Sequence, residues 1–277
     1  MEDAILSLKL KMVERINLDR AKHGLPPVKY DPLASKVGDA HCREMLEWGY
    51  VSHWNRKGWK PYLRYAQAGG DDFNTENLSV SKYYSSTPGD HINVREAIFN
   101  NHRDMLKERP PNDGHRKNIL DPYHTHVGIG LAFDRNRVYM AQEFLNRYVE
   151  FKPPFPRRVH LRDQVTVSGK VLSKSYTVQS ISVFYEPLPQ PMTVEVLNKT
   201  GTYALPKERY DLLPRLEPGM FYKKGGRGDI VLRGRGFKCA LPFFREEAGV
   251  YTVVVWVRDG HGQVLPASEV AILVTEE

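Results

Sequence analysis

The first half of the chain repeats its apolar residues every three or four positions, which is the spacing of helices that bury one face. Ile5, Leu8 and Met12 begin one such stripe, and Asp31 followed by Pro32 is a typical helix start. After residue 125 the apolar positions favour strands instead. The elements predicted in this half are helices over residues 3–22, 32–48, 94–106 and 117–120, and strands over residues 126–133 and 137–144.

Short alternating segments rich in Val, Tyr, Phe and Thr dominate the second half of the chain. The segment Tyr203–Gly228 is polar and rich in Gly and Pro, so we expect a long loop there. Seven short strands over this length are typical of an immunoglobulin-like β-sandwich. These strands are predicted over residues 164–172, 181–185, 193–197, 229–232, 237–242, 249–258 and 264–274.

A proline-rich segment separates the two patterns. Pro153, Pro154 and Pro156 exclude a helix or a central strand, which indicates a stiff linker. The predicted fold class is therefore α+β, with a mixed domain over residues 1–151, a linker over 152–157 and an all-β sandwich over 158–277. Each half has enough apolar residues for a core of its own, so we expect cleavage within the linker to release two folded pieces.

Composition narrows the classes of protein that fit. Hydrophobic residues make up 41% of the 277 positions, which excludes a wholly disordered chain. No apolar run reaches the ~18 residues of a membrane-spanning helix, so an integral membrane protein is excluded. Cys42 and Cys239 are too few for a disulfide-rich scaffold or a four-thiolate zinc site, and two reduced, partly buried thiols are expected rather than a disulfide.

The N-terminal sequence M-E-D-A-I-L-S-L lacks the basic leader and the continuous apolar stretch of a signal peptide. Two alternatives follow from this observation. Either the protein is cytosolic, or the sequence begins after a signal that has been removed.

The net charge of +7 is modest and dispersed, which argues against a nucleic-acid partner. It is compatible with binding to anionic surfaces, but a solvated and slightly basic surface is the interpretation that it favours. Basic residues do gather in the second half, between glycines. This cluster has two interpretations: a contact with an anionic polymer, or a solvated loop that keeps an edge strand from pairing. Its members are Lys223, Lys224, Arg227, Arg233, Arg235 and Lys238.

Candidate chemistry lies in the first half, where eight of the ten histidines occur. His53 follows the second predicted helix, Glu76 is predicted to lie in a polar loop, and His115 opens the helical turn near residue 117. Each histidine taken alone fits a structural role. Two imidazoles and a carboxylate in one place would suit a divalent metal or acid–base chemistry near neutral pH.

Five ordered motifs resemble those of the CAP superfamily, which includes cysteine-rich secretory proteins, insect venom antigens and plant pathogenesis-related proteins. The start of the family domain is similar to R-I-N-L-D-R-A-K-H-G-L-P-P-V and D-P-L-A-S-K-V-G-D-A-H-C-R-E-M. In family order follow S-H-W-N, T-E-N-L, D-G-H-R-K-N-I-L, and the pair H-V-G-I-G-L and V-Y-M-A-Q-E-F. The resemblance covers residues 5–146, and the second histidine motif is closest to the bacterial form.

This resemblance implies a three-layer α–β–α sandwich with a cleft of two histidines and two acidic residues. His53, Glu76 and His115 match three of these positions. The fourth stays open between Asp104, His102 and no residue at all, because the tryptophan that usually marks this helix is missing.

The resemblance further implies a secreted or surface-associated protein whose cleft binds a ligand, either a lipid, a peptide or a cell-wall component. A divalent cation such as Zn²⁺ is expected on His53, Glu76 and His115, although no cofactor is obligatory. No general reaction is established for the fold, so we expect a binding protein rather than an enzyme. Two alternatives are a metal-dependent hydrolase and a structural or adhesive module with a vestigial cleft.

Overall fold

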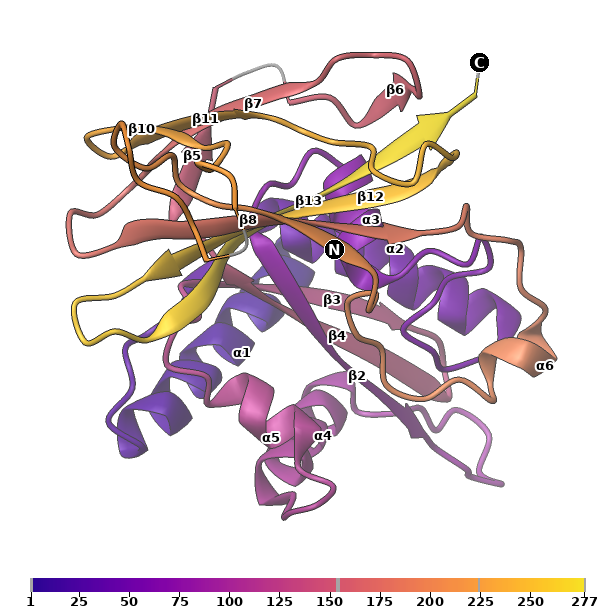
Figure 1. Ribbon diagram of the computed structural model, residues 1–277. Helices are drawn as coiled ribbons and strands as arrows, with labels where there is room; N and C mark the ends of the chain where they lie inside the picture. The colour runs from indigo at the N-terminus through magenta and orange to yellow at the C-terminus, as the bar shows by residue number, and fades with distance from the viewer. Residues whose placement is uncertain (1, 153–154, 224, 277) are drawn as a thin grey trace. The chain divides into compact units, whose positions relative to one another are not determined.

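The computed structural model describes residues 2–152, 155–223 and 225–276 (Figure 1). Contacts divide the chain into two compact units. The first, which we call the histidine unit, consists of the residues up to Pro61 together with 74–145 and 191–203. The second, the strand unit, consists of residues 62–73, 146–190 and those from 204 onward. Each unit therefore includes one segment from the other half of the sequence.

The histidine unit is built on a four-stranded sheet in the order β1-β3-β4-β2. β1 runs parallel to β3, and β3 pairs antiparallel with β4. The strands are β1 (Lys29–Tyr30), β2 (Phe73–Lys82), β3 (His126–Phe133) and β4 (Arg137–Asn146). The helices are α1 (Glu2–Lys22), α2 (Pro32–Trp48), α4 (Val94–Lys107), α5 (Gly114–Ile119) and α6 (Val194–Leu197).

Helices cover both faces of this sheet, so the predicted three-layer arrangement is confirmed (Figure 1). Burial of apolar side chains in two separate cores is the main force that holds the layers together. One core joins α1, α4 and α5 to the sheet through Met12, Ile16, Ile98, Met105, Ile119 and Ile129. The other joins α2 and α6 to the opposite face through Cys42, Met45, Tyr139, Ala141 and Leu197.

The predicted limits of α2 are confirmed by its caps. An Asp31 carboxylate oxygen accepts a hydrogen bond from the Ala34 amide at 2.7 Å, and Gly49 ends the helix in the left-handed conformation. The backbone of α2 lies directly against β3, since a Cβ atom on Gly130 would lie 2.2 Å from the Gly38 carbonyl carbon. This packing fixes the end of α2, from which the chain enters the turn that contains His53.

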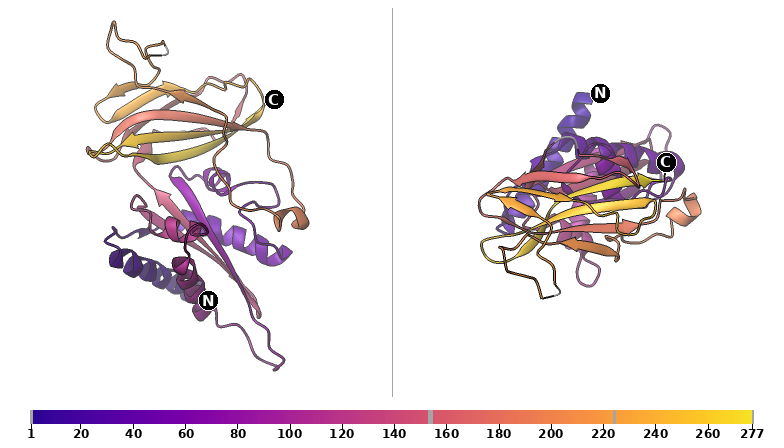
Figure 2. Two further views of the ribbon diagram at one scale, coloured as in Figure 1. Left: turned by 60° about the horizontal axis from the view of Figure 1, so that its bottom comes forward. Right: turned by 45° about the horizontal axis from the view of Figure 1, so that its top comes forward.

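The strand unit contains two sheets, in the orders β10-β11-β7-β5 and β6-β13-β12-β8-β9, and confirms a strand-rich second half (Figure 2). Side chains along β7 and β11 alternate between buried and exposed, as expected when one face of a sheet meets solvent. The first sheet consists of β5 (Val149–Phe151), β7 (Thr166–Val171), β10 (Val231–Arg233) and β11 (Gly236–Ala240). The second consists of β6 (Arg158–His160), β8 (Thr177–Glu186), β9 (Arg209–Leu212), β12 (Gly249–Arg258) and β13 (Val264–Thr275).

Residues 62–73 form part of the strand unit although they precede most of the first domain. They contain nearly all of α3 (Pro61–Gln67), and the Gln67 side-chain amide donates to the Ala271 carbonyl oxygen on β13 at 3.3 Å. The Arg147 guanidinium pairs with Asp72 at 2.7 Å. This segment covers strands that are buried along almost their whole length.

Several details differ from the sequence predictions, and the short strands β1, β5 and β6 were not predicted. Residues 75–78 lie on β2 rather than in a loop, and α3 was not predicted. Residues 194–197 form a helical turn, not a strand, because the Thr193 hydroxyl caps the Val196 amide. The expected loop over 203–228 includes β9. Of the predicted linker and basic cluster, Pro153, Pro154 and Lys224 lie outside the described residues.

Both cysteines, Cys42 and Cys239, are reduced, as the sequence predicted, and they are buried rather than partly buried. Burial raises the pKa of the Cys239 thiol to about 12. None of the described helices is both long enough and apolar enough to cross a membrane.

Candidate functional site

The first half of the candidate site is an imidazole–carboxylate pair formed by His53 and Glu76. The Nδ1 atom of His53 lies 2.8 Å from Oε1 of Glu76, and the Glu76 side chain is fully buried on β2. The imidazole itself keeps 17% of its surface exposed. A buried carboxylate on Nδ1 fixes the orientation of the ring and directs Nε2 away from the pair.

His115 forms a second pair of the same kind with Glu108. Its Nδ1 atom lies 2.5 Å from Oε1 of Glu108, whose other oxygen accepts a hydrogen bond from the His115 amide at 3.0 Å. Glu108 caps α4 with an extended backbone, and His115 is the second residue of α5. One carboxylate thus holds both the ring and the backbone of His115.

Polar side chains of β2 connect the two pairs. Asn77, next to Glu76, donates to the His115 carbonyl oxygen at 3.3 Å and accepts from the Asn118 amide at 2.9 Å. Thr75, on the other side of Glu76, donates to Asn118 at 2.7 Å. These bonds fix α5 against β2, so the two imidazole–carboxylate pairs belong to one hydrogen-bonded assembly, which we call the histidine site.

Residues 191–203, which we call the strap, complete the histidine site from the far half of the sequence. The Glu76 amide donates to the Tyr203 hydroxyl at 2.9 Å, and the Tyr203 ring lies 4.8 Å from the His53 ring. The hydroxyls of Ser52, which precedes His53, and Thr200 are 2.6 Å apart. Leu197 anchors the strap because its side chain is fully buried in the α2 core.

The structure does not bring Asp104 to the histidine site. Its carboxylate is 67% exposed on α4 and faces Lys107 at 3.6 Å. His102, the other candidate for the fourth position, lies in the core between Asp19 and Gln142. Burial lowers the pKa of His102 to about 4, against the opposing effect of Asp19, so this imidazole is neutral near pH 7. Glu108, rather than Asp104, is the carboxylate that bonds to His115.

The predicted metal ligands do not form a three-ligand set. Within residues 2–152, 155–223 and 225–276, no group of three His, Cys, Asp or Glu side chains is arranged to hold a metal ion. Glu76 already bonds to His53 and Glu108 to His115, so both carboxylates orient imidazoles rather than offering a third donor.

Two residues of the site, Glu108 and Tyr203, were not predicted. A signal for Glu108 is present in the sequence, because Pro110 and Pro111 end the preceding helix and Glu108 is the last carboxylate before these prolines. No comparable signal marks Tyr203. It lies in a segment that follows the predicted linker, and its role depends on long-range folding.

Comparisons with known proteins agree with these motifs. The profile of the CAP family, described as the cysteine-rich secretory protein family, matches residues 13–148. Two curated proteins of Bacillus subtilis (strain 168) are similar. The uncharacterized protein YkwD is 28% identical over 127 residues, which cover 46% of this chain and 43% of that protein. The uncharacterized membrane protein YlbC is 27% identical over 138 residues, which cover 50% of this chain and 34% of that protein.

The chain thus spans less than half the length of these two curated relatives. Among solved structures, an extracellular protein containing a SCP domain from Bacillus anthracis str. Ames has a TM-score of 0.39 and 22% identity, over 50% of this chain and 40% of that chain. An outer surface protein from Borrelia burgdorferi has a TM-score of 0.37 and 15% identity, over 48% of this chain and 88% of that chain.

Proposed function

Because residues 13–148 belong to the CAP family, we propose that the histidine site binds a polar ligand outside the cell and does not transform it chemically. The family's description as secretory supports the extracellular location. We assign the strand unit, with its excess of cations, the role of attaching the protein to an anionic polymer of the cell surface. A cell-wall glycopeptide is the ligand class that we assign to the histidine site.

The observation on which this proposal rests is the pairing of both imidazoles with carboxylates through Nδ1. Such a pair holds a ring in one orientation and presents Nε2 as a fixed hydrogen-bonding group. The surrounding groups are also polar: Asn77, Asn118 and the Tyr203 hydroxyl. Sugar hydroxyls and peptide groups fit this surface better than an acyl chain, because polar groups covered by an apolar ligand would lose their hydrogen bonds to water.

A hydrolase has less support. The Ser52 hydroxyl, which is adjacent to His53 in sequence, bonds instead to Thr200 and to the Trp54 amide. Cys42 is fully buried in the α2 core. Cation binding through the two imidazoles stays a prediction, and the two pairs of the histidine site account for the proposed binding without it.

The test is calorimetric titration of the full chain with a soluble disaccharide–peptide fragment of peptidoglycan. Glu108→Gln removes the charge that orients His115, and we expect the affinity to fall about tenfold, since a hydrogen bond to a charged group contributes about 1.5–3 kcal/mol. Asp104→Ala is the matched control, because it removes an exposed carboxylate of the preceding helix, outside the histidine site. This control should bind like the unmodified protein.

Mass spectrometry of the fragment after incubation separates binding from catalysis. An unchanged fragment that binds less tightly to Glu108→Gln supports the proposal. Cleavage that is lost in His115→Ala would instead establish a hydrolase. Equal affinity of the Glu108→Gln and Asp104→Ala variants would show that the histidine site does not contact this ligand.

A further inference from the structure

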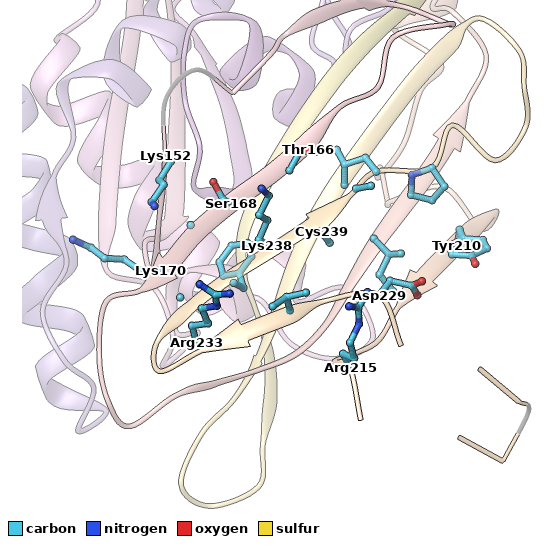
Figure 3. Close-up of a pocket in the computed structure, with 18 residues that line it drawn as sticks. Lys152, Thr166, Ser168, Lys170, Tyr210, Arg215, Asp229, Arg233, Lys238 and Cys239 are labelled. Atoms are coloured by element: carbon cyan, nitrogen blue, oxygen red, sulfur yellow. The ribbon is translucent and has the colours of Figure 1, made fainter. Parts of the chain in front are cut away.

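A hollow of about 1080 Å³ lies on the strand unit, over the exposed face of the β10-β11-β7-β5 sheet (Figure 3). Small residues form much of its floor, including Ser168 on β7 and Gly236 and Ala240 on β11. Among its described lining residues, Asp229 is the single carboxylate, against five cations. The cations are Lys152, Lys170, Arg215, Arg233 and Lys238.

The pairing of the strands sets the spacing of three of these cations. Lys170 on β7 and Arg233 on β10 are both paired with Gly236 on β11, one from each side. Neighbouring strands lie about 4.8 Å apart, so the two Cα atoms are separated by about 10 Å with no side chain between them. Lys238 is the next residue of β11 on the same face, paired with Ser168 and Val231. Gly236 and Ser168 therefore form the floor of a groove that runs between Lys170, Arg233 and Lys238.

Most of this positive charge is not neutralised by the protein. Lys170 pairs with Glu150 at 2.8 Å, and both of these side chains are more than half exposed. In the part of the chain that the structure describes, Lys152, Arg215, Arg233 and Lys238 form no ion pair, although Asp229 lines the same hollow. Several cations over a concave surface raise the local concentration of anions.

We propose that this hollow is a binding site for a linear polyanion, a polymer with repeating phosphate or carboxylate groups. This inference deepens the attachment role proposed for the strand unit, because it gives that role a site. The hollow is open, its five cations are exposed, and three of them lie on three different strands. That arrangement suits several anionic groups of one extended chain better than a single small anion, which needs convergent donors.

The site differs from the basic cluster that the sequence indicated. Only Arg233 and Lys238 belong to both, while Lys152, Lys170 and Arg215 come from other parts of the sequence. Arg235 is not a lining residue, since its guanidinium donates to the Leu172 carbonyl oxygen at 2.6 Å. Strand pairing, rather than proximity in sequence, gathers the cations.

The experiment measures binding of the full chain to linear polyphosphate and to polygalacturonate at low salt. The triple variant Lys170→Glu, Arg233→Glu and Lys238→Glu should lose affinity at least tenfold for the polymer that binds. A control with the same net charge reverses three exposed cations that do not line the hollow: Arg162→Glu, Lys174→Glu and Lys207→Glu. Ser168→Leu adds a steric test, because it fills the floor and leaves the charge unchanged.

We expect the triple variant and Ser168→Leu to weaken binding while the control triple variant keeps most of it. Raising the salt from 50 to 200 mM should weaken binding on the order of tenfold for about three ionic contacts. The tighter of the two polymers identifies the anionic group as phosphate or carboxylate. His115→Ala should bind either polymer normally, so a failure at the histidine site is distinguishable from a failure here.

Three outcomes would overturn the proposal. The first is no binding of either polymer at low salt. The second is an equal loss in the two triple variants, which would indicate an unspecific effect of net charge. The third is tighter binding of duplex DNA than of both polymers, with the same dependence on the hollow, which would make the partner a nucleic acid.

Discussion

A single backbone conformation determines which carboxylate reaches His115. Asp104 and Glu108 are four positions apart, and on a continuing helix they would share a face. The helix ends at Lys107, however, and Glu108 has an extended backbone with ψ of 147°. This change redirects the Glu108 side chain to His115, whereas Asp104 keeps the direction of the helix and stays in solvent. Residue type and spacing alone left the fourth position open between Asp104, His102 and no residue, and did not indicate Glu108.

The buried His102 predicts a specific pH dependence of stability. Its pKa is lowered from 6.5 to about 4 by burial. Between these values the unfolded chain binds a proton at this residue and the folded chain does not. The free energy of unfolding should therefore fall as the pH falls from 6.5 to 4, by up to about 3 kcal/mol at 1.36 kcal/mol per pKa unit.

Urea unfolding at a series of pH values between 7.5 and 4 measures this effect. His102→Gln should flatten the profile in that window, and His91→Gln, which removes an exposed imidazole, should leave it as in the unmodified protein. If the profiles of His102→Gln and the unmodified protein are parallel, protonation of another group destabilises the protein in acid.

At the scale of elements, the contact between α2 and β3 depends on paired glycines. A Cβ atom on Gly130 would lie 2.5 Å from the Gly38 Cα atom, well inside normal contact, and both partners are backbone. Because backbone cannot move aside as a flexible side chain can, we expect Gly130→Ala to destabilise the protein by more than about 2 kcal/mol. Thermal melts measure the change.

Gly114→Ala is the control for this prediction. A Cβ atom there meets nothing within 4 Å, and alanine favours the helical backbone of α5. Its melting temperature should stay the same or rise. A Gly130→Ala variant that melts like the unmodified protein would show that the close contact between α2 and β3 does not limit the stability of the fold.

Elements with apolar faces were predictable from the sequence, and elements stabilised by polar contacts were not. The stripes of α1, α2 and α4 and the β3–β4 hairpin follow directly from hydrophobic spacing. In β2, however, Asn74, Glu76 and Asn77 are buried, so the inward positions are polar and no apolar alternation marks the strand. His53, Glu76 and His115 were found by motif, while Glu108 and Tyr203 required knowledge of where the chain returns.

At the scale of the whole molecule, each half of the sequence contributes one segment to the unit that is built mainly from the other half. Residues 62–73 belong to the strand unit, and the strap of residues 191–203 belongs to the histidine unit. The predicted boundary at residues 152–157 therefore separates each unit from one of its own segments. Apolar composition indicated two cores, but it could not show that either core needs residues from the other half.

We accordingly expect that a chain cleaved at an introduced protease site near residue 155 elutes as one species in gel filtration. Each fragment, once separated in denaturant, should fail to give a cooperative melt alone. Two fragments that separate without denaturant and melt cooperatively would show that the two halves of the sequence fold independently.

Leu197→Ala tests which contact holds the cleaved halves together. Leu197 is fully buried, and its loss should weaken their association by about 2–5 kcal/mol, the usual cost of such a truncation in a core. Val196→Ala is the matched neighbour, because Val196 is 49% exposed and its removal should leave the association unchanged.

The strap also sets an order for synthesis on the ribosome. His53, Glu76, Glu108 and His115 all leave the exit tunnel long before Tyr203 and the anchoring Leu197 are translated. A nascent or prematurely terminated chain that stops before the strap thus contains all four imidazole and carboxylate groups without the finished arrangement around His53. On the proposed function, we expect such an incomplete chain to bind the ligand weakly, because it lacks the contacts of Tyr203 with Glu76 and His53.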